Sequence, residues 1–259
     1  MKVAIFGDVH GNSIALDAVL EDIEKQGGVD AYWLLGDYAA IGVDPVGCIQ
    51  RIAKLPNTEF IRGNTDRIAR EDLALSPPFF DAVENEDAAG VIKWAQAHVT
   101  FSWTLGAVQE AGLADWLRAL PLEYRTTLPD GTKVLLVHAS PGTDEGEGLH
   151  PHQSDEELEK LFAGDDADLI FVGHTHVAVD KQIAGKRLIN ASSVSNPFPP
   201  DLDANYLILE ADETGHSIER HNVTYDREAV IRKAEELKHP GREYIIGFMR
   251  GTNQAHWMR

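Results

Sequence analysis

Short apolar runs that end in polar, glycine-bearing turns recur along the chain, and this pattern constrains the fold more than any other feature. Apart from one two-residue run, these runs have the length of a short buried strand, and each turn marks where the strand ends. The runs are Val3 to Phe6, Tyr32 to Leu35, Glu59 to Arg62, Val134 to Val137, Leu169 to Val172, Leu188 to Ile189 and Tyr206 to Leu209. The chain is therefore predicted to build a β-sheet core from them.

Helical patterns separate many of these strands. Asn12 is placed to cap one helix, and Pro45 stands near the start of another. This strand–helix alternation over the first 65 residues predicts an α/β fold with parallel pairing. The segment from Leu188 to Val223 is instead typical of strands joined by hairpins, with a turn at Asp212 to Gly215. The sheet is therefore predicted to be mixed.

A chain of 259 residues with 43% hydrophobic content can bury a sizeable core, and residues 1–259 are predicted to form a single domain. Within it, residues from about Pro77 to Leu120 are predicted to form a helical insertion, a candidate cap over the functional site. Trp94, Trp103 and Trp116 of this insertion are expected to pack against the protein rather than to bind a ligand.

The net charge limits the kinds of molecule that the chain is expected to bind. A formal charge of −19, from 42 acidic and 23 basic residues, argues against a broad cationic surface for a nucleic acid polymer or an anionic membrane. A small phosphorylated substrate stays possible, because bound cations invert the local electrostatics. The single cysteine, Cys48, fits a reducing compartment, and no apolar run is long enough for a signal peptide or a membrane span. A cytoplasmic location is therefore expected.

The first candidate site residues are Asp8 and His10, in a turn directly after the first predicted strand. A carboxylate oxygen and an imidazole nitrogen together suit manganese, zinc or iron better than magnesium or calcium. Alone, an Asp-x-His triplet is a weak signal because it arises often by chance.

Two further predicted strands end in side chains that carry oxygen ligands. Asp37 follows the second run, and Asn64, with Thr65 and Asp66 after it, follows the third. The carboxyl ends of strands are the edge where open α/β sheets bind ligands. Taken singly, these Gly-Asp and Gly-Asn-Thr-Asp segments are more typical of ordinary turns than of a ligand site.

Histidines follow two more strands. His138 follows Val134 to Val137, and His174 and His176 follow Leu169 to Val172. Alternate side chains of an extended segment share a face, so His174 and His176 can project to the same side. A lone histidine at a strand end is more often structural, but two together are harder to explain in that way.

Taken together, these residues favour a metal site over separate turns and structural histidines. Five strand ends supply seven ligand-type side chains: Asp8, His10, Asp37, Asn64, His138, His174 and His176. Seven ligands exceed the four of a closed zinc site and suit two ions that share a carboxylate. Two such ions can bind a phosphoryl group, activate a water and stabilise the leaving oxygen. The sequence therefore predicts a dinuclear metal-dependent phosphoesterase.

In this order the motifs resemble those of the calcineurin-like metallophosphoesterase superfamily, across roughly residues 3–176. The stretches 36–45, 137–141 and 189–194 resemble its small prokaryotic, phosphodiesterase-like members. The resemblance implies a four-layer αββα sandwich of two mixed β-sheets flanked by helices.

The resemblance also implies roles for the ligands. Asp8, His10, Asp37 and His176 would hold one metal, and Asp37, Asn64, His138 and His174 the other. Asp37 would bridge two divalent ions, with manganese the first expectation and iron, zinc or nickel the alternatives, and a metal-bound hydroxide would be the nucleophile. Asn12 is expected to add a hydrogen bond to the phosphate, although helix capping explains it equally well.

Thr65 departs from the family pattern. It stands where relatives carry a histidine that is thought to protonate the leaving oxygen or bind phosphate. A threonine hydroxyl can hydrogen-bond a phosphate oxygen, but it cannot titrate near pH 7. Asn64 and Thr65 are the predicted catalytic residues, and Asp66, without a histidine to orient, is expected to cap the segment that follows.

The leading function is hydrolysis of a phosphodiester in a small or nucleotide-like substrate. Phosphomonoesterase and protein phosphatase are alternatives, the latter ranked lower because the histidine after Gly-Asn is missing. A metal-binding scaffold with little catalysis is the alternative from another class.

Two segments leave alternatives open. The acidic stretch Thr143 to Gly148, followed by His150 and His152, is predicted to be a solvated loop, with a mobile substrate loop or a second metal site as alternatives. The tail from His239 to Arg259 is expected to dock either on the domain or on a second subunit.

Overall fold

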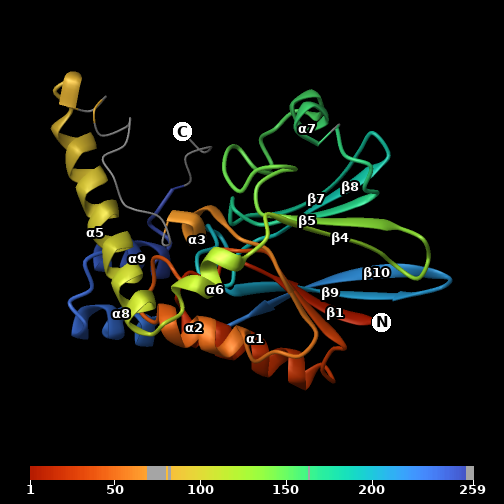
Figure 1. Cartoon of the computed structure of the whole chain (residues 1–259), viewed down its shortest axis with the longest axis horizontal. Coiled ribbons are helices and arrows are strands. Elements are labelled where there is room, and N and C mark those ends of the chain that lie inside the picture. Colours follow the sequence, from red (N-terminus) through yellow and green to blue (C-terminus); the bar gives the residue numbers. More distant parts are fainter. Residues whose placement is uncertain (69–79, 81–82, 163, 255–259) are drawn as a thin grey trace.

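Two five-stranded β-sheets lie face to face with helices on their outer sides in the computed structural model of the chain (Figure 1). The structure describes residues 1–68, 80, 83–162 and 164–254. The fold is the four-layer αββα sandwich of class α/β that the motifs implied.

The first sheet contains the strands from both ends of the sequence. Its order is β10-β9-β1-β2-β3. The strands are β1 (Lys2–Phe6), β2 (Ala31–Leu34), β3 (Thr58–Phe60), β9 (Ala204–Asp212) and β10 (Gly215–Val223). Strands β1, β2 and β3 are parallel, whereas β9 and β10 form an antiparallel hairpin beside β1. The predicted mixed pairing and the predicted hairpin are both confirmed.

The second sheet repeats this plan in the order β4-β5-β6-β8-β7. Its strands are β4 (Glu123–Thr127), β5 (Lys133–Val137), β6 (Leu169–Val172), β7 (Ala178–Ile183) and β8 (Lys186–Ala191). The three central strands are parallel, and β4 and β7 pair antiparallel at the two edges.

The layer between the sheets is apolar because alternate residues of each strand point inwards. Ile5, Trp33 and Leu209 of the first sheet meet Leu136 and Phe171 of the second, and all five are buried. Removing each such side chain from water contributes about 1.5–3 kcal/mol. This layer fixes one sheet against the other, and so fixes the strand ends of both sheets at one edge.

Helices cover the outer faces. On the first sheet lie α1 (Ser13–Lys25), α2 (Pro45–Ile52) and α6 (Ala114–Ala119), and on the second lies α7 (Asp155–Phe162). The predicted cap of α1 is confirmed, since the Ala15 N–H donates to Asn12 Oδ1 at 3.1 Å.

Two more helices come from the segment after β3. They are α3 (Asn64–Ile68) and the 23-residue α5 (Ala88–Glu110). Two of the three tryptophans pack against other segments as predicted: the ring of Trp116 lies 5.3 Å from that of Phe60, and Trp103 lies against His239. Trp94 stacks on His98 of its own helix. Residues 77–79 and 81–82 of the predicted insertion lie outside the described residues. Across the described ranges, no helix is both long and apolar enough to cross a bilayer.

The C-terminal segment forms α8 (Arg227–Glu236) and α9 (Arg242–Met249). Ile245 and Phe248 of α9 are buried in one cluster with Val230 of α8 and Val43. Of the two alternatives for the tail, this part therefore docks on its own domain, whereas residues 255–259 lie outside the described part.

The turn between α8 and α9 gives a pH prediction. Burial lowers the pKa of His239 to about 4, and the Gly241 N–H donates to its Nδ1. Histidine titrates near 6.5 in an unfolded chain, so the unfolded state takes up the proton first. Stability is therefore lost as the pH falls from about 6.5 to 4, by up to about 3 kcal/mol. His239→Asn keeps an acceptor for Gly241 but cannot titrate. We expect urea unfolding at pH 7.5 and 4.5 to show a smaller acid loss in the variant, and equal losses would contradict this origin.

Candidate metal centre

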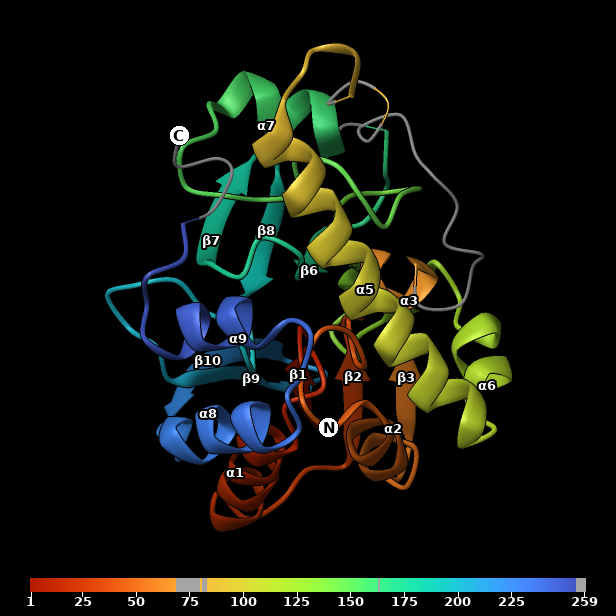
Figure 2. The same ribbon diagram turned by 90° about the vertical axis from the view of Figure 1, so that its left-hand side faces the viewer.

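The strand ends of both sheets meet at one edge and bring the seven predicted ligands together. Asp8 follows β1, Asp37 follows β2, and Asn64 begins α3 after β3. His138 follows β5, and two histidines follow β6. Figure 2 shows α5 crossing in front of this edge. The sheets therefore fix where the seven predicted ligands lie, and the loops orient their side chains.

One group of donor atoms gathers around His176. Its Nε2 lies 3.2 Å from Asp8 Oδ1 and 3.0 Å from His10 Nε2. His10 Nε2 also lies 3.7 Å from Asp37 Oδ2. Asp8, His10 and His176 form a set whose donor atoms all lie within 4.8 Å of one another.

A second group gathers around His138. Its Nε2 lies 3.4 Å from Asp37 Oδ2 and 3.1 Å from Asn64 Oδ1. The same Asn64 oxygen lies 3.1 Å from His174 Nδ1. Asp37 thus contacts both groups, which is the position that a bridging carboxylate needs.

The far nitrogen of each histidine ring contacts a backbone carbonyl. The four pairs are His10 Nδ1 with Ala40 O at 2.5 Å, His138 Nδ1 with Leu35 O at 2.6 Å, His174 Nε2 with Gly146 O at 2.8 Å and His176 Nδ1 with Asn196 O at 3.1 Å. A carbonyl only accepts, so the ring nitrogen next to it carries the hydrogen. In a neutral ring the other nitrogen then presents a lone pair to the cluster, as in metal-binding histidines.

This arrangement fits divalent ions. The lone pairs of His10 Nε2 and His176 Nε2 face each other at 3.0 Å, which is repulsive without a shared cation. Ligand distances of about 2.1 Å bring two nitrogens on one ion to roughly 3.0–3.4 Å. Burial lowers the pKa of His10 and of His174, which keeps both rings in the neutral form that binds metal.

His138 and Asp37 behave as an ion pair. Burial lowers the pKa of His138, but the Asp37 carboxylate outweighs burial and raises it to about 10. Burial likewise raises the pKa of Asp37, and the facing His138 lowers it well below its usual range. A metal ion here would take the place of the shared proton, so its binding would release a proton.

The backbone is strained at most of the candidate ligands. Five of the seven have positive φ: Asp8 at 52°, His10 at 46°, Asp37 at 57°, His174 at 70° and His176 at 57°. Such conformations cost about 1 kcal/mol or more each in residues other than glycine and collect at functional sites. The surrounding fold therefore holds these side chains in place against a local cost.

Asp66 is part of that surrounding structure. It is fully buried, and its carboxylate accepts from the backbone N–H groups of Asp37, Tyr38 and Gly63 at 2.7, 2.9 and 2.9 Å. Burial, reinforced by the charge of Asp37, raises its pKa to about 7. The expectation that Asp66 caps the following segment was wrong, because it ties the two loops that carry Asp37 and Asn64.

Thr65 and Asn12 lie in different settings. The Thr65 N–H donates to Asp37 Oδ1 at 2.9 Å, and its buried Oγ1 has no hydrogen-bond partner among the described residues. Asn12 is 1% exposed, and its amide is engaged by Ala15 and by Ser195 Oγ. Its expected phosphate contact stays a prediction.

The acidic loop after β5 is held more firmly than its composition indicates. Asp144 is buried and accepts from Arg62 Nε at 2.7 Å and Arg67 Nε at 3.1 Å. The same loop provides the Gly146 carbonyl that contacts His174. The prediction of a solvated loop is confirmed for Glu145 to Glu147, which are exposed, and was wrong for Asp144, because two arginines from the β3–α3 segment pair with it. His150 and His152 belong to no metal-ligand cluster within the described ranges.

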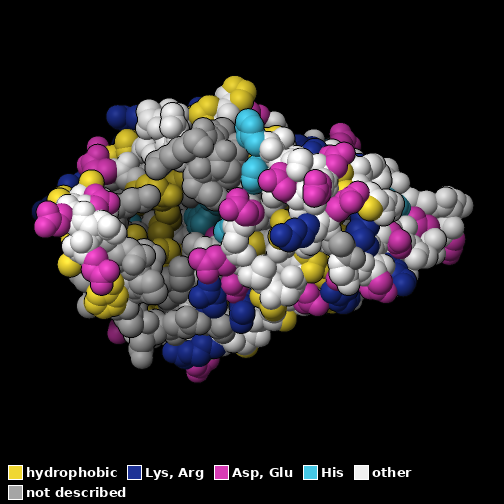
Figure 3. All heavy atoms as spheres, turned by 90° about the horizontal axis from the view of Figure 1, so that it is seen from above, with side chains coloured by type: hydrophobic (Ala, Val, Ile, Leu, Met, Phe, Trp, Pro, Cys, Tyr) yellow, Lys and Arg dark blue, Asp and Glu magenta, His cyan; other side chains and the backbone are white. Residues whose placement is uncertain are grey.

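A cavity of about 370 Å³ adjoins the cluster. One wall consists of candidate site residues: His10, Asp37, Asn64, Thr65, His174 and His176. The other lining residues include members of α5, α9 and the turn before α9. The helix α5 belongs to the insertion that was predicted as a candidate cap, whereas α9 and the turn before it were not predicted as site elements. In Figure 3 this face is hollowed, with hydrophobic and histidine side chains inside.

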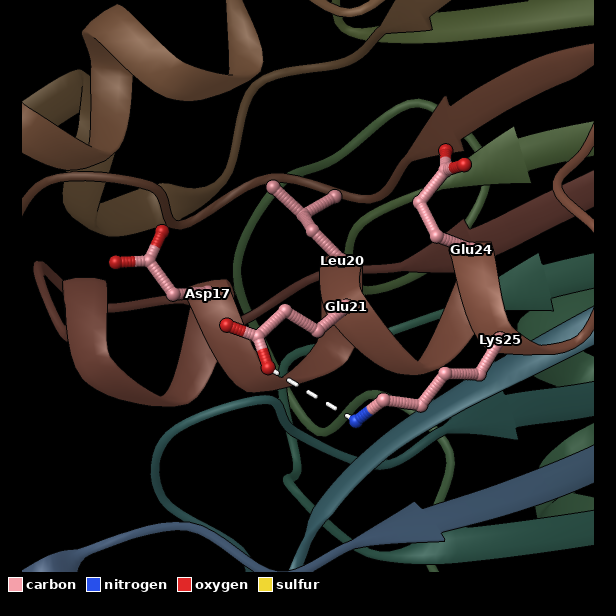
Figure 4. A pocket seen from close by; sticks show the side chains of 5 residues that line it. All are labelled: Asp17, Leu20, Glu21, Glu24 and Lys25. Atoms are coloured by element: carbon pink, nitrogen blue, oxygen red, sulfur yellow. Dashed lines mark ion pairs between the residues drawn. The ribbon is translucent and has the colours of Figure 1, made fainter.

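Another depression, of about 620 Å³, lies along α1 and contains none of the candidate ligands (Figure 4). Its lining includes Glu21 and Lys25, whose exposed side chains pair at 3.9 Å. Such an exposed pair contributes little to stability.

Gly63 gives a test of the close packing around Asp37. A Cβ at this position would lie 2.0 Å from Asp37 Oδ1 and 2.5 Å from its backbone nitrogen. We expect Gly63→Ala to cost about 1–3 kcal/mol in stability and to weaken manganese binding at least about tenfold. Gly106→Ala is the control, because nothing lies within 4 Å of its Cβ position on α5, and it should raise stability by up to about 1 kcal/mol. Urea unfolding and calorimetric titration would measure both, and normal metal affinity in Gly63→Ala would contradict this packing.

Comparison with known proteins agrees with this geometry. An uncharacterized protein of Methanocaldococcus jannaschii is 31% identical over 252 residues, which cover 90% of each chain. The symmetrical bis(5'-nucleosyl)-tetraphosphatase of Chromohalobacter salexigens is 28% identical over 159 residues, 60% of this chain and 47% of that protein. A crystal structure of a metallophosphoesterase from Sphaerobacter thermophilus covers 98% of this chain and 100% of its own, with a TM-score of 0.74 and 26% identity.

The family match covers most of the sequence. The description of the matching family is calcineurin-like phosphoesterase superfamily domain, and it spans residues 1–214. The ordered strand-end motifs, the two mixed sheets and this match agree, and the chain belongs to the calcineurin-like phosphoesterase superfamily.

Proposed function

We propose that the chain is a dinuclear metal-dependent phosphodiesterase that acts on a small, nucleotide-like substrate. The observation that carries the proposal is the pair of donor groups on either side of Asp37, which opens onto a cavity of about 370 Å³. A cavity of this size suits a small molecule rather than a polymer. The formal charge of −19 also disfavours a nucleic acid polymer as substrate.

The residues divide into two sets. Asp8, His10 and His176 would hold one ion, Asn64, His138 and His174 the other, and Asp37 both. Bound there, two divalent ions supply positive charge for a phosphoryl group and lower the pKa of a bound water. Manganese is the first choice because the donors mix oxygen and nitrogen, with iron, zinc or nickel as alternatives.

Thr65 completes the site on the substrate side. Its N–H holds Asp37 Oδ1 in place, and its Oγ1 has no hydrogen-bond partner among the described residues. A hydroxyl at this wall of the cavity can donate to a phosphate oxygen and so orient it. It cannot deliver a proton to a leaving alkoxide as an imidazole does, so substrates with good leaving groups should react best.

One relative supports the nucleotide part of this proposal, a symmetrical bis(5'-nucleosyl)-tetraphosphatase by name. Its similarity covers 60% of this chain and supports a nucleotide-like substrate.

Turnover of bis(p-nitrophenyl) phosphate tests the proposal. We expect hydrolysis that requires added manganese or nickel, stops with a chelator, and exceeds that of p-nitrophenyl phosphate, the monoester control. No turnover with any divalent ion, while calorimetry shows that ions bind, would overturn the proposal.

A scaffold role is the second candidate, because Thr65 replaces the usual proton donor. In that case the chain binds a partner protein and catalyses little. Asp37→Ala separates the two ideas, since a scaffold should keep its partner after the metals are lost.

A further inference from the structure

The cavity beside the metal centre is lined by two chemically different sets of residues. One set contains the candidate ligands and Thr65. The apolar set, here called the apolar lobe, is Ile41, Ala97, Phe101, Pro240 and Tyr244, of which the last four come from α5, α9 and the turn before α9. A site for inorganic phosphate alone has no use for an apolar lobe, so the lobe bears on the organic part of the substrate.

We propose that the apolar lobe binds the uncharged aromatic group of the phosphoester, with the nucleobase of a nucleotide as its ligand. This proposal rests on the proposed function and extends it by assigning the second half of the cavity. Phe101 from α5 and Tyr244 from α9 line the lobe together. Aromatic side chains of this kind stack on flat, uncharged rings of any base.

The lobe is a built feature, because its two helices meet. A Cβ on Gly241 would lie 2.9 Å from the Thr100 side chain, so the turn before α9 packs tightly against α5. Tyr244 in turn contacts Phe248 of α9, with ring centroids 4.9 Å apart. Phe248 lies 6.1 Å from the ring of His176, so the same helix contacts both the lobe and a candidate metal ligand.

The charges of the lining favour a neutral group in the lobe. Glu243 and Gln96 also line the cavity, and both offer oxygen acceptors to the N–H edge of a base. None of the described residues lining the cavity is a lysine or arginine. A further phosphate in the lobe would meet Glu243 without a compensating side-chain cation. A single phosphoryl group at the metals and one uncharged ring in the lobe suit this lining better than a polyphosphate chain.

Ligand binding to the manganese-loaded protein tests the lobe. Calorimetric titration with methyl phosphate, phenyl phosphate and adenosine 5'-monophosphate compares ligands that share the phosphate and differ in the group beyond it. Removing roughly 55 Å² of apolar surface from water strengthens binding about tenfold. We therefore expect phenyl phosphate and the nucleotide to bind at least about tenfold more tightly than methyl phosphate.

Two matched variants test whether the tighter binding of aromatic ligands arises in the apolar lobe. Ala97→Phe fills the lobe and should remove the advantage of the aromatic ligands over methyl phosphate. Ala95→Phe is the control, because Ala95 is also exposed on α5 but does not line the cavity. Equal affinities for the three phosphates in the wild-type protein, or an advantage that survives Ala97→Phe, would overturn the proposal.

Adenosine without phosphate separates this proposal from the proposed function. Saturable binding of adenosine that Ala97→Phe abolishes would support the lobe even if no phosphoester were hydrolysed, in which case only the phosphodiesterase assignment fails. Phosphate binding and turnover without any binding of adenosine or preference for aromatic esters would keep the enzyme and overturn the lobe.

Discussion

Replacing Asp37 with alanine is expected to lower the turnover of bis(p-nitrophenyl) phosphate by at least roughly 10³-fold. Asp37 contacts both donor groups, at 3.7 Å from His10 Nε2 and 3.4 Å from His138 Nε2, so its loss affects both ion positions. Metal ions stabilise the transition state of phosphoryl transfer by several kcal/mol, and about 1.4 kcal/mol corresponds to a factor of ten in rate. Steady-state kinetics at saturating manganese would measure the change.

The control for this variant is Asp115→Ala. Asp115 is 93% exposed at its side chain and pairs with Arg118 of the same helix. Its removal should leave turnover within about twofold. A circular dichroism spectrum should show that Asp37→Ala folds, because the buried His138 can lose its proton when its partner is removed. A folded Asp37→Ala protein with more than a tenth of the wild-type turnover would contradict the bridging role.

Introducing a histidine at position 65 is expected to increase activity selectively. Thr65→His restores an imidazole beside the cavity, and a positioned general acid contributes about 10²–10⁴-fold. The gain should appear with a poor alkoxide leaving group, such as a methyl ester, and should be small for p-nitrophenolate, which needs no proton. Asp66 is engaged by three backbone N–H groups and is not free to orient the new ring, which places the expected gain near the lower limit.

For Thr65→His, the measurement is the ratio of the turnover rate of the methyl ester to that of the p-nitrophenyl ester. Thr65→Gln is the matched control, because it adds a polar side chain of similar length that cannot titrate. The histidine variant should also add an ionisation near pH 6.5 to the profile of the methyl ester. An equal change for both leaving groups, or the same gain in Thr65→Gln, would argue against a role in leaving-group protonation.

Much of the site was predictable because its geometry follows from local sequence. Asp8, Asp37 and His138 each stand directly after a short apolar run or one glycine beyond it, and a strand's end fixes where the next side chain lies. The order of those strand ends also gave the family and hence the two-sheet architecture. The strands β4 and β7 were missed because their sequences alternate weakly and carry charges, as expected at sheet edges.

Features that depend on contacts between residues far apart in the sequence could not be predicted. The acidic loop looks solvated in sequence, but Asp144 is buried by arginines about 80 residues earlier. The apolar lobe joins Ala97 of α5 to Tyr244 of α9, and neither residue has a local pattern that marks a ligand site. Asp66 likewise forms its bonds with a loop 28–29 residues away.

The metal content of the purified chain tests the central claim most directly. After equilibration with manganese and removal of free ions, mass spectrometry of the metal should give two ions per wild-type chain. Anomalous diffraction should place one beside Asp8, His10 and His176 and the other beside Asn64, His138 and His174. A chain that binds one ion or none, or that binds two ions away from Asp37, would contradict the account.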